Sequence, residues 1–120
     1  MVDADGSRAA DVAVADGDIV AVGPDAVDEI GGEGAVDAET DATGAVVAPG
    51  LIDAHVHVML DGRPDVATAV ADSDYTASYR AAGNLRDALE AGVTTVRDLG
   101  SRGTLALDAG EAVAAGDIPG

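Results

Sequence analysis

The sequence predicts an α/β protein, because strand-like and helix-like segments alternate through its second half. An apolar strand pattern covers residues 51–58, and apolar residues recur at helical spacing over residues 73–91. A second strand pattern over residues 93–99 and a weaker helix pattern over residues 104–115 follow. Residues 1–48 differ, because they contain only short strand patterns separated by turn residues. The chain therefore divides into a β-rich segment and a longer α/β segment.

The β-rich segment begins with a strong hairpin signal, Asp16-Gly17 between two alternating strand patterns. Proline cannot donate to a strand ladder, so Gly23-Pro24 ends the second of these strands. Acidic and glycine residues then predict a surface loop, and Thr43-Gly44 predicts a turn between two last short strands. In order, the expected elements are strands over residues 10–15 and 19–22, a loop over residues 25–34, and strands over residues 35–38 and 45–47.

The strand over residues 51–58 carries both histidines of the chain, His55 and His57. Successive side chains of a strand point to opposite faces, so the two imidazoles project the same way, together with the carboxylate of Asp53. Neutral imidazole is the commonest metal-binding side chain, and two of them side by side on a rigid strand provide half of a metal site. The alternative is a pair of ordinary strand histidines, since short motifs also arise by chance.

Residues 49–57, with the sequence PGLIDAHVH, resemble the signature of the amidohydrolase superfamily, metal-dependent hydrolases built on a (β/α)8 TIM barrel. Residues 92–100, GVTTVRDLG, resemble the second barrel strand of its imidazolonepropionase-like and dipeptidase-like branch. Such a barrel needs about 200 residues or more, so we expect this chain of 120 residues to be an N-terminal fragment. Residues 1–48 are then part of a small β-sandwich, with an independent β-module as the alternative, and residues 49–120 are the first two βα units of an incomplete barrel.

This resemblance implies that His55 and His57 bind a divalent metal, usually zinc, with one or two ions in the full-length protein. The metal makes water a nucleophile, which attacks the carbonyl carbon of an amide, a cyclic amide or a dipeptide-like C–N bond. Asp53 is expected either to orient a ligand or to make a buried structural hydrogen bond. In the family, a lysine, two further histidines and a catalytic aspartate come from later strands. Because none of these is present, we expect the chain alone to contain no catalytic residue, to bind metal weakly and to be inactive.

Two other functions remain open. A non-catalytic relative could keep the scaffold for binding or assembly, although such relatives often lose the metal histidines that are retained here. A small β-rich module could bind a metal structurally, but the strand and helix pattern of residues 49–120 argues against it.

The segment after the histidine strand is predicted to be a loop over residues 59–71, followed by a helix that begins near Ser73. Arg63 in this loop either binds an anionic substrate group or is solvated, as lone loop arginines commonly are. Gly92 fits the stop of the helix. The helix face packed on the barrel is expected to carry the residues at helical spacing, namely Tyr75, Tyr79, Ala82, Leu85 and Leu89.

The second strand brings Arg97 and Asp98 to its carboxyl end, which is the functional end in parallel barrels. We favour an ion pair that ties this strand to its neighbours over a catalytic role for these two residues. A helix is expected over residues 104–115, and residues 117–120 are expected to open a further strand.

The charge balance is strongly acidic, with 23 Asp and Glu residues against six basic residues, all arginine, and a net charge of −17. This charge excludes a nucleic-acid-binding surface, because the phosphate backbone would be repelled. Acidity with few aromatic residues can indicate disorder, but 48% of the residues are hydrophobic and they are patterned. We therefore favour a folded protein whose acidic surface stays hydrated in high salt. Its composition resembles that of proteins from salt-accumulating, halophilic microbes.

The chain contains no cysteine, which excludes disulfides and thiolate metal ligands. No apolar run approaches the roughly 18 residues of a membrane span, and the acidic N-terminus is unlike a signal peptide. We expect a cytoplasmic protein with a small-molecule or dipeptide-like substrate and with no nucleic-acid or membrane partner. A homo-oligomer is left open.

Overall fold

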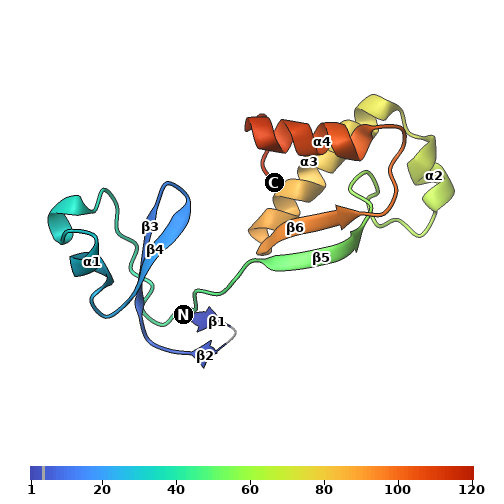
Figure 1. The fold of residues 1–120 in the computed structure, drawn as a ribbon. Helices are drawn as coiled ribbons and strands as arrows, with labels where there is room; N and C mark the ends of the chain where they lie inside the picture. The colour runs from blue at the N-terminus through green and yellow to red at the C-terminus, as the bar shows by residue number, and fades with distance from the viewer. Residues whose placement is uncertain (4) are drawn as a thin grey trace. The chain divides into compact units, whose positions relative to one another are not determined.

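The computed structural model describes residues 1–3 and 5–120, which form two compact units, residues 1–49 and 50–120 (Figure 1). Within these residues, the first unit contains two antiparallel strand pairs, a short α-helix and a 3-10 turn. The second contains a parallel strand pair and three α-helices. Each unit has its own cluster of buried apolar side chains. Among the helices described, none is both long enough and apolar enough to cross a membrane.

The first unit is built on the hairpin of β3 (Asp11–Ala15) and β4 (Asp18–Gly23), which confirms the turn expected at Asp16-Gly17. Both turn residues have positive φ angles, 52° for Asp16 and 86° for Gly17, as a tight two-residue hairpin turn requires. Strands β1 (Val2–Asp3) and β2 (Gly6–Ser7) form a second antiparallel pair.

The loop predicted over residues 25–34 is wrong, because this segment contains helix α1 (Ala26–Glu29) and enters a 3-10 turn, η1 (Glu33–Ala35). The side chain of Ala26 is fully buried in a cluster with Ala13 and Ala21 of the hairpin. Burial of small apolar side chains against the hairpin therefore explains a helix where the composition indicated a loop.

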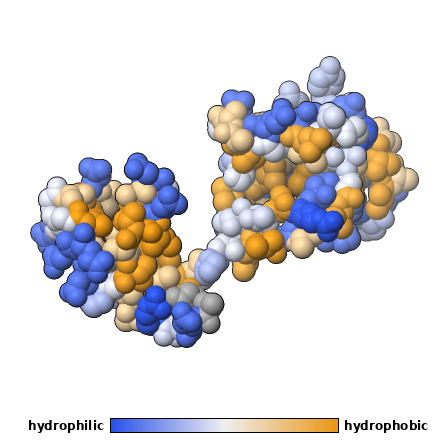
Figure 2. Space-filling view, in the orientation of Figure 1, coloured by the Kyte–Doolittle hydropathy of each residue, from blue (hydrophilic) through white to orange (hydrophobic). Residues whose placement is uncertain are grey.

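The strands expected over residues 35–38 and 45–47 do not form in the part of the chain that the structure describes. One backbone hydrogen bond, from Val2 N–H to Val47 O at 2.7 Å, is found there in place of a ladder. The turn expected at Thr43-Gly44 is present, with Ala45 N–H donating to Ala42 O at 2.9 Å. Figure 2 shows that apolar residues instead gather over the β3–β4 hairpin.

In the second unit, β5 (Leu51–Val56) and β6 (Val93–Asp98) form a parallel pair, as expected for strands joined through a helix. Their register pairs Leu51 with Val93 at one end and Val56 with Asp98 at the other. Helix α3 (Asp74–Glu90) follows β5, helix α4 (Leu105–Ala115) follows β6, and both lie on the same side of the strand pair (Figure 1). This alternation of strands and helices confirms the α/β class.

Helix α3 begins and ends close to the predicted positions. Ser73 caps its start by accepting a hydrogen bond from Thr76 N–H at 3.2 Å, and Gly92 follows its end with a φ angle of 87°. The predicted packing face is wrong for both tyrosines, because Tyr75 and Tyr79 are each 80% exposed. Leu85 of the predicted face is buried, as expected, but the other buried residues of the helix are Ala77 and Ala81. Alanines allow the neighbouring chain to approach the helix closely, whereas tyrosine rings need more room.

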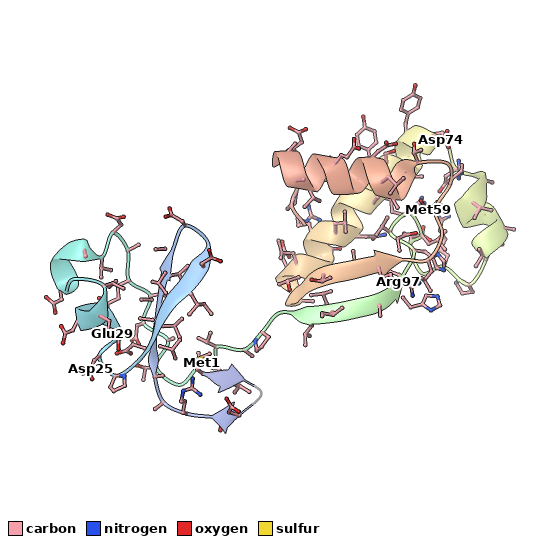
Figure 3. The ribbon with its side chains drawn as sticks, in the orientation of Figure 1. Met1, Asp25, Glu29, Met59, Asp74 and Arg97 are labelled. Atoms are coloured by element: carbon pink, nitrogen blue, oxygen red, sulfur yellow. The ribbon has the colours of Figure 1, made fainter. Side chains whose placement is uncertain are left out.

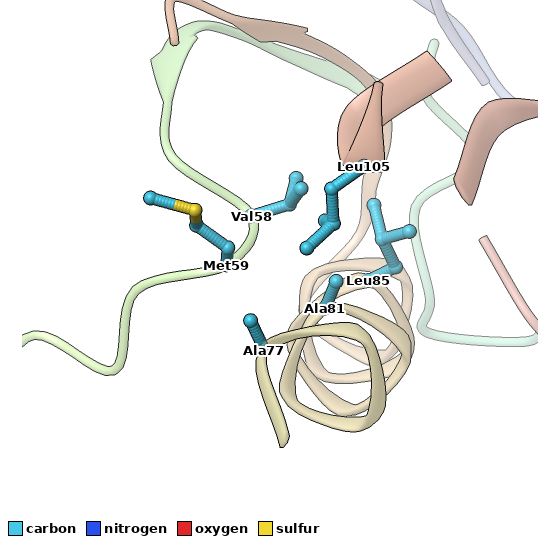
Figure 4. Packing of buried hydrophobic residues seen from close by; sticks show 6 residues of the cluster. All are labelled: Val58, Met59, Ala77, Ala81, Leu85 and Leu105. Carbon is cyan, nitrogen blue, oxygen red and sulfur yellow. The ribbon is translucent and has the colours of Figure 1, made fainter. Parts of the chain in front are cut away.

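The core of the second unit consists of Val58, Met59, Ala77, Ala81, Leu85 and Leu105 (Figure 4). Val58 and Met59 come from the chain after β5, and Leu105 begins α4. Val56 and Val96 of the two strands are partly buried against this cluster. Within the described residues, no polar or charged residue is buried. The core therefore links the end of β5 directly to α3 and α4.

The segment predicted as a loop over residues 59–71 contains helix α2 (Val66–Ala71). Asp65 caps this helix by accepting a hydrogen bond from Thr68 N–H at 3.3 Å. The first N–H groups of a helix have no acceptor within the helix, and Asp65 supplies one of them with an acceptor. Residues 117–120 do not form the strand expected there, and Ile118 instead packs against the core.

Candidate functional site

The histidine motif lies at the carboxyl end of β5. His55 is within the strand, but the strand ends earlier than expected and His57 is the first residue after it. The cause is a turn in which Leu60 N–H donates to His57 O at 2.9 Å, and this turn carries Val58 into the core. A turn rather than the strand ladder therefore places His57.

The two imidazoles lie side by side and are exposed. Their ring centroids are 5.5 Å apart, with an angle of 76° between the ring planes. Nδ1 of His57 is 2.8 Å from the carbonyl oxygen of Gly100. Because a carbonyl oxygen only accepts, this contact requires a proton on Nδ1, which in the neutral ring leaves the lone pair on Nε2. Metal-binding histidines commonly have such a carbonyl partner on the other ring nitrogen.

Asp53 lies on the same strand and contacts the backbone of the motif. Its Oδ1 accepts a hydrogen bond from His55 N–H at 3.0 Å. The residue is exposed, so the bond forms at the surface of the strand. The carboxylate thus stabilises the backbone next to His55.

Asp98, at the end of β6, has a role that the sequence did not indicate. The favoured ion pair does not form, because neither Arg97 nor Asp98 has an ion-pair partner among the residues described. Instead, Oδ2 of Asp98 accepts from Val58 N–H and Oδ1 accepts from Gly100 N–H, each at 2.8 Å. Asp98 therefore joins the turns that follow both strands, while Arg97 lies exposed near the carboxyl end of β6 (Figure 3). One feature of the sequence could have indicated this role: the histidine motif and Asp98 both lie at the carboxyl ends of the two predicted strands.

The two sequence motifs are also in contact at the amino ends of their strands. Leu51 N–H donates to Gly92 O at 2.9 Å. Gly50 lies so close to Thr94 that a Cβ atom added at Gly50 would be 1.9 Å from Thr94 Oγ1. The absence of a side chain at Gly50 therefore allows β5 and β6 to pair closely at their amino ends, while the histidines lie at the opposite end of β5.

Two arginines and two aspartates form ion pairs that join the segment after β5 to α3. Arg63 pairs with Asp61 and also lies 3.4 Å from Asp72, so it is neither isolated nor merely solvated. Arg80 pairs with the same two aspartates. The hydrogen bond from Arg63 lowers the pKa of Asp61 to about 2, and the bond from Arg80 lowers the pKa of Asp72. Asp61 therefore stays ionised well into the acidic range, and the pKa of Asp72 lies below its ordinary value.

The donor atoms of the site fit a transition metal in kind but not in number. Imidazole nitrogens suit zinc, and the bond from His57 to Gly100 leaves Nε2 of His57 with a lone pair. Catalytic zinc sites, however, use three protein ligands. Among the residues that the structure describes, no group of three His, Cys, Asp or Glu side chains could hold a metal ion.

Parallel strands that carry polar side chains at their carboxyl ends define a class of α/β proteins whose sites lie at this end of the sheet. A family model described as the amidohydrolase family matches residues 46–118, more than half of the sequence. The chain therefore belongs to the amidohydrolase family, as the resemblance of residues 49–57 implied.

The curated relatives that match are allantoinases. The allantoinase of Rubrobacter xylanophilus is 53% identical over 58 residues, which are 48% of this chain and 12% of that protein. An allantoinase of Escherichia coli is 46% identical over 57 residues, 48% of this chain and 11% of the relative. That of Enterococcus faecalis is 52% identical over 48 residues, 40% of this chain and 9% of the relative. The match thus spans only 9–12% of the length of these relatives.

Proposed function

We propose that this chain supplies the first metal-binding strand of a hydrolase that cleaves a C–N bond of a small cyclic amide. Family membership supports hydrolysis, and the name of the allantoinase relatives supports a cyclic amide as substrate. The observation that carries the proposal is the pair His55 and His57 at the end of β5, with Nδ1 of His57 bound to Gly100 O. Residues 49–120 are proposed to begin a (β/α)8 barrel, and residues 1–48 to form part of a β-sandwich.

His55 and His57 would hold a divalent cation, for which zinc is the proposed identity. When bound, the cation supplies Lewis acidity, which makes water more nucleophilic at neutral pH and polarises a carbonyl group. The chain's own residues prepare this site. Gly100 O keeps the proton of His57 on Nδ1, and Asp98 holds Gly100 N–H at 2.8 Å. Asp53 fixes the backbone of His55 and is proposed to orient that ligand.

We further propose that the chain alone is inactive and binds metal weakly. It contains two histidines and no lysine, so it offers fewer protein ligands than a catalytic zinc site uses. A cytoplasmic location stays a prediction. Adaptation of the acidic surface to high salt also stays a prediction, and it is based on the net charge of −17.

The test is a titration of the chain with Co²⁺, followed by visible absorption, at high salt to screen the surface carboxylates. We expect the wild type to bind Co²⁺ weakly. The affinity of His55→Ala and of His57→Ala should be lower by about 10–100-fold, the loss that is common when a metal site is disturbed. Arg97→Gln is the matched control, because Arg97 is exposed near the carboxyl end of the neighbouring strand β6. Undiminished binding in a variant that lacks both histidines would show that carboxylates bind the ion. Turnover of allantoin by the chain alone would refute its proposed inactivity.

A further inference from the structure

We propose that Asn84 of α3 is a positioning residue for His57, because it holds the turn that sets the position of this histidine. The inference rests on the proposed metal site, but it concerns a residue outside the motif. His57 is exposed and lies beyond the last residue of β5, so side-chain packing and the strand ladder do not fix it, and its ring has only the Nδ1 hydrogen bond to Gly100 O among the described residues. Whether the ring reaches Gly100 O depends on the backbone that follows His57.

Asn84 binds two residues of this turn. Its Nδ2 donates to Val58 O at 2.7 Å and to Leu60 O at 2.6 Å. Leu60 N–H closes the turn on His57 O at 2.9 Å, and Val58 N–H is held by Asp98 at 2.8 Å. The residue next to His57 therefore has both of its backbone groups bound, one by α3 and the other by β6.

Arg80 completes the contact from one helical turn earlier. Residues four apart lie on the same face of a helix, so Arg80 and Asn84 project together. Nη1 of Arg80 donates to Met59 O at 3.0 Å. Three successive carbonyl groups, those of residues 58–60, thus accept hydrogen bonds from α3 side chains. These groups lie outside any regular element, and partly buried backbone acceptors need such donors.

The amide is the chemistry that this turn requires. Asn84 uses both N–H bonds of one nitrogen for two carbonyl oxygens. An aspartate of the same shape would direct a charged acceptor at those oxygens and repel them. An alanine would leave both carbonyl groups without this donor. Either change should free the turn and, with it, the ring of His57.

The experiment compares Asn84→Asp and Asn84→Ala with the control Ser78→Ala. Ser78 lies on the same helix, but among the described residues its hydroxyl binds only Asp74 O of that helix, at 2.8 Å. The first readout needs no metal: imidazole ¹⁵N NMR at a pH where both rings are neutral. We expect His57 to be protonated on Nδ1 in the wild type and in the control, and to become a mixture of tautomers in the Asn84 variants. His55, held within β5, is the internal reference and should not change.

The second readout is the affinity for Co²⁺, which we expect to fall by about tenfold in the Asn84 variants and to stay constant in the control. Unchanged His57 tautomers together with unchanged affinity would overturn the proposal. If the wild type binds no Co²⁺, the proposed metal site fails, and the NMR readout still decides the role of Asn84. If Asn84→Asp does not fold, as judged by circular dichroism, Asn84→Ser replaces it, because serine is neutral, small and donates only one hydrogen bond.

Discussion

Replacing Gly50 by alanine should destabilise the unit of residues 50–120, although the same change stabilises many proteins. A Cβ atom at Gly50 would lie 1.9 Å from Oγ1, 2.5 Å from Cγ2 and 2.7 Å from Cβ of Thr94. Rotation of Thr94 cannot clear this contact, because its own Cβ is too close and β-branched side chains are stiff. The strands must therefore move apart near the pairing of Leu51 with Val93.

The magnitudes decide the sign of this effect. Overpacking costs about 1–3 kcal/mol. Three atoms of Thr94 lie closer than 3 Å to the added Cβ, but the exposed position of Gly50 permits some relaxation, so we take a cost of about 2 kcal/mol. The smaller entropy of an unfolded chain with alanine offsets about 0.4–1 kcal/mol. We expect a net loss of about 1 kcal/mol, or about 4–8 °C in Tm for a domain of this size.

The matched control is Gly83→Ala in α3. A Cβ atom at Gly83 meets nothing within 4 Å, so this variant should gain about 0.5–1 kcal/mol. Urea unfolding followed by circular dichroism at the helical band reports on α3 and α4 and measures both variants. The double variant Gly50→Ala/Thr94→Ala should recover part of the loss, because two of the three close contacts disappear. A Gly50→Ala chain as stable as the wild type would refute the reasoning.

Two further predictions concern charge. The folded pKa of Asp61, about 2, lies below its ordinary value of 3.8, so the associated stability is present above about pH 4 and is lost as the pH falls toward 2. Tm measured from pH 5 to pH 2 should fall, and less so in Arg63→Gln, which removes the main cause of the shift; equal slopes would contradict this. Raising KCl from about 0.1 M to 1 M shortens the screening length from about 10 Å to about 3 Å, so Tm should rise in a chain with a net charge of −17. A Tm that falls with salt would show that specific ion pairs outweigh the general repulsion.

The sequence was most informative where local chemistry decides the structure. The Asp16-Gly17 turn, the Ser73 cap and the strand patterns before His55 and in β6 all act over a few neighbouring residues, and the structure contains each of these elements. The family could also be predicted, because residues 49–57 form a specific motif.

Features that depend on distant contacts could not be read in the same way. The packed face of α3 carries Ala77 and Ala81 because other parts of the chain come close there, whereas periodicity selected the larger Tyr79. The roles of Asp98 and Asn84 depend on turns more than 20 residues away, at separations of 40 and 24–26 positions. Polar side chains that bind backbone groups leave no periodic pattern in the sequence.

Because β5 has an open edge, salt has two opposite effects on this protein: it stabilises the fold and it favours aggregation. Within the described residues β5 has a neighbour on one side only, and Leu51 and Ile52 are 60% and 71% exposed. An open, apolar strand edge is a template for pairing with another copy of the chain. The charge of −17 keeps copies apart, but salt shortens the range of that repulsion. High ionic strength therefore stabilises the folded chain but also weakens the repulsion between chains that opposes aggregation. A low protein concentration in high salt should keep the chain both folded and soluble.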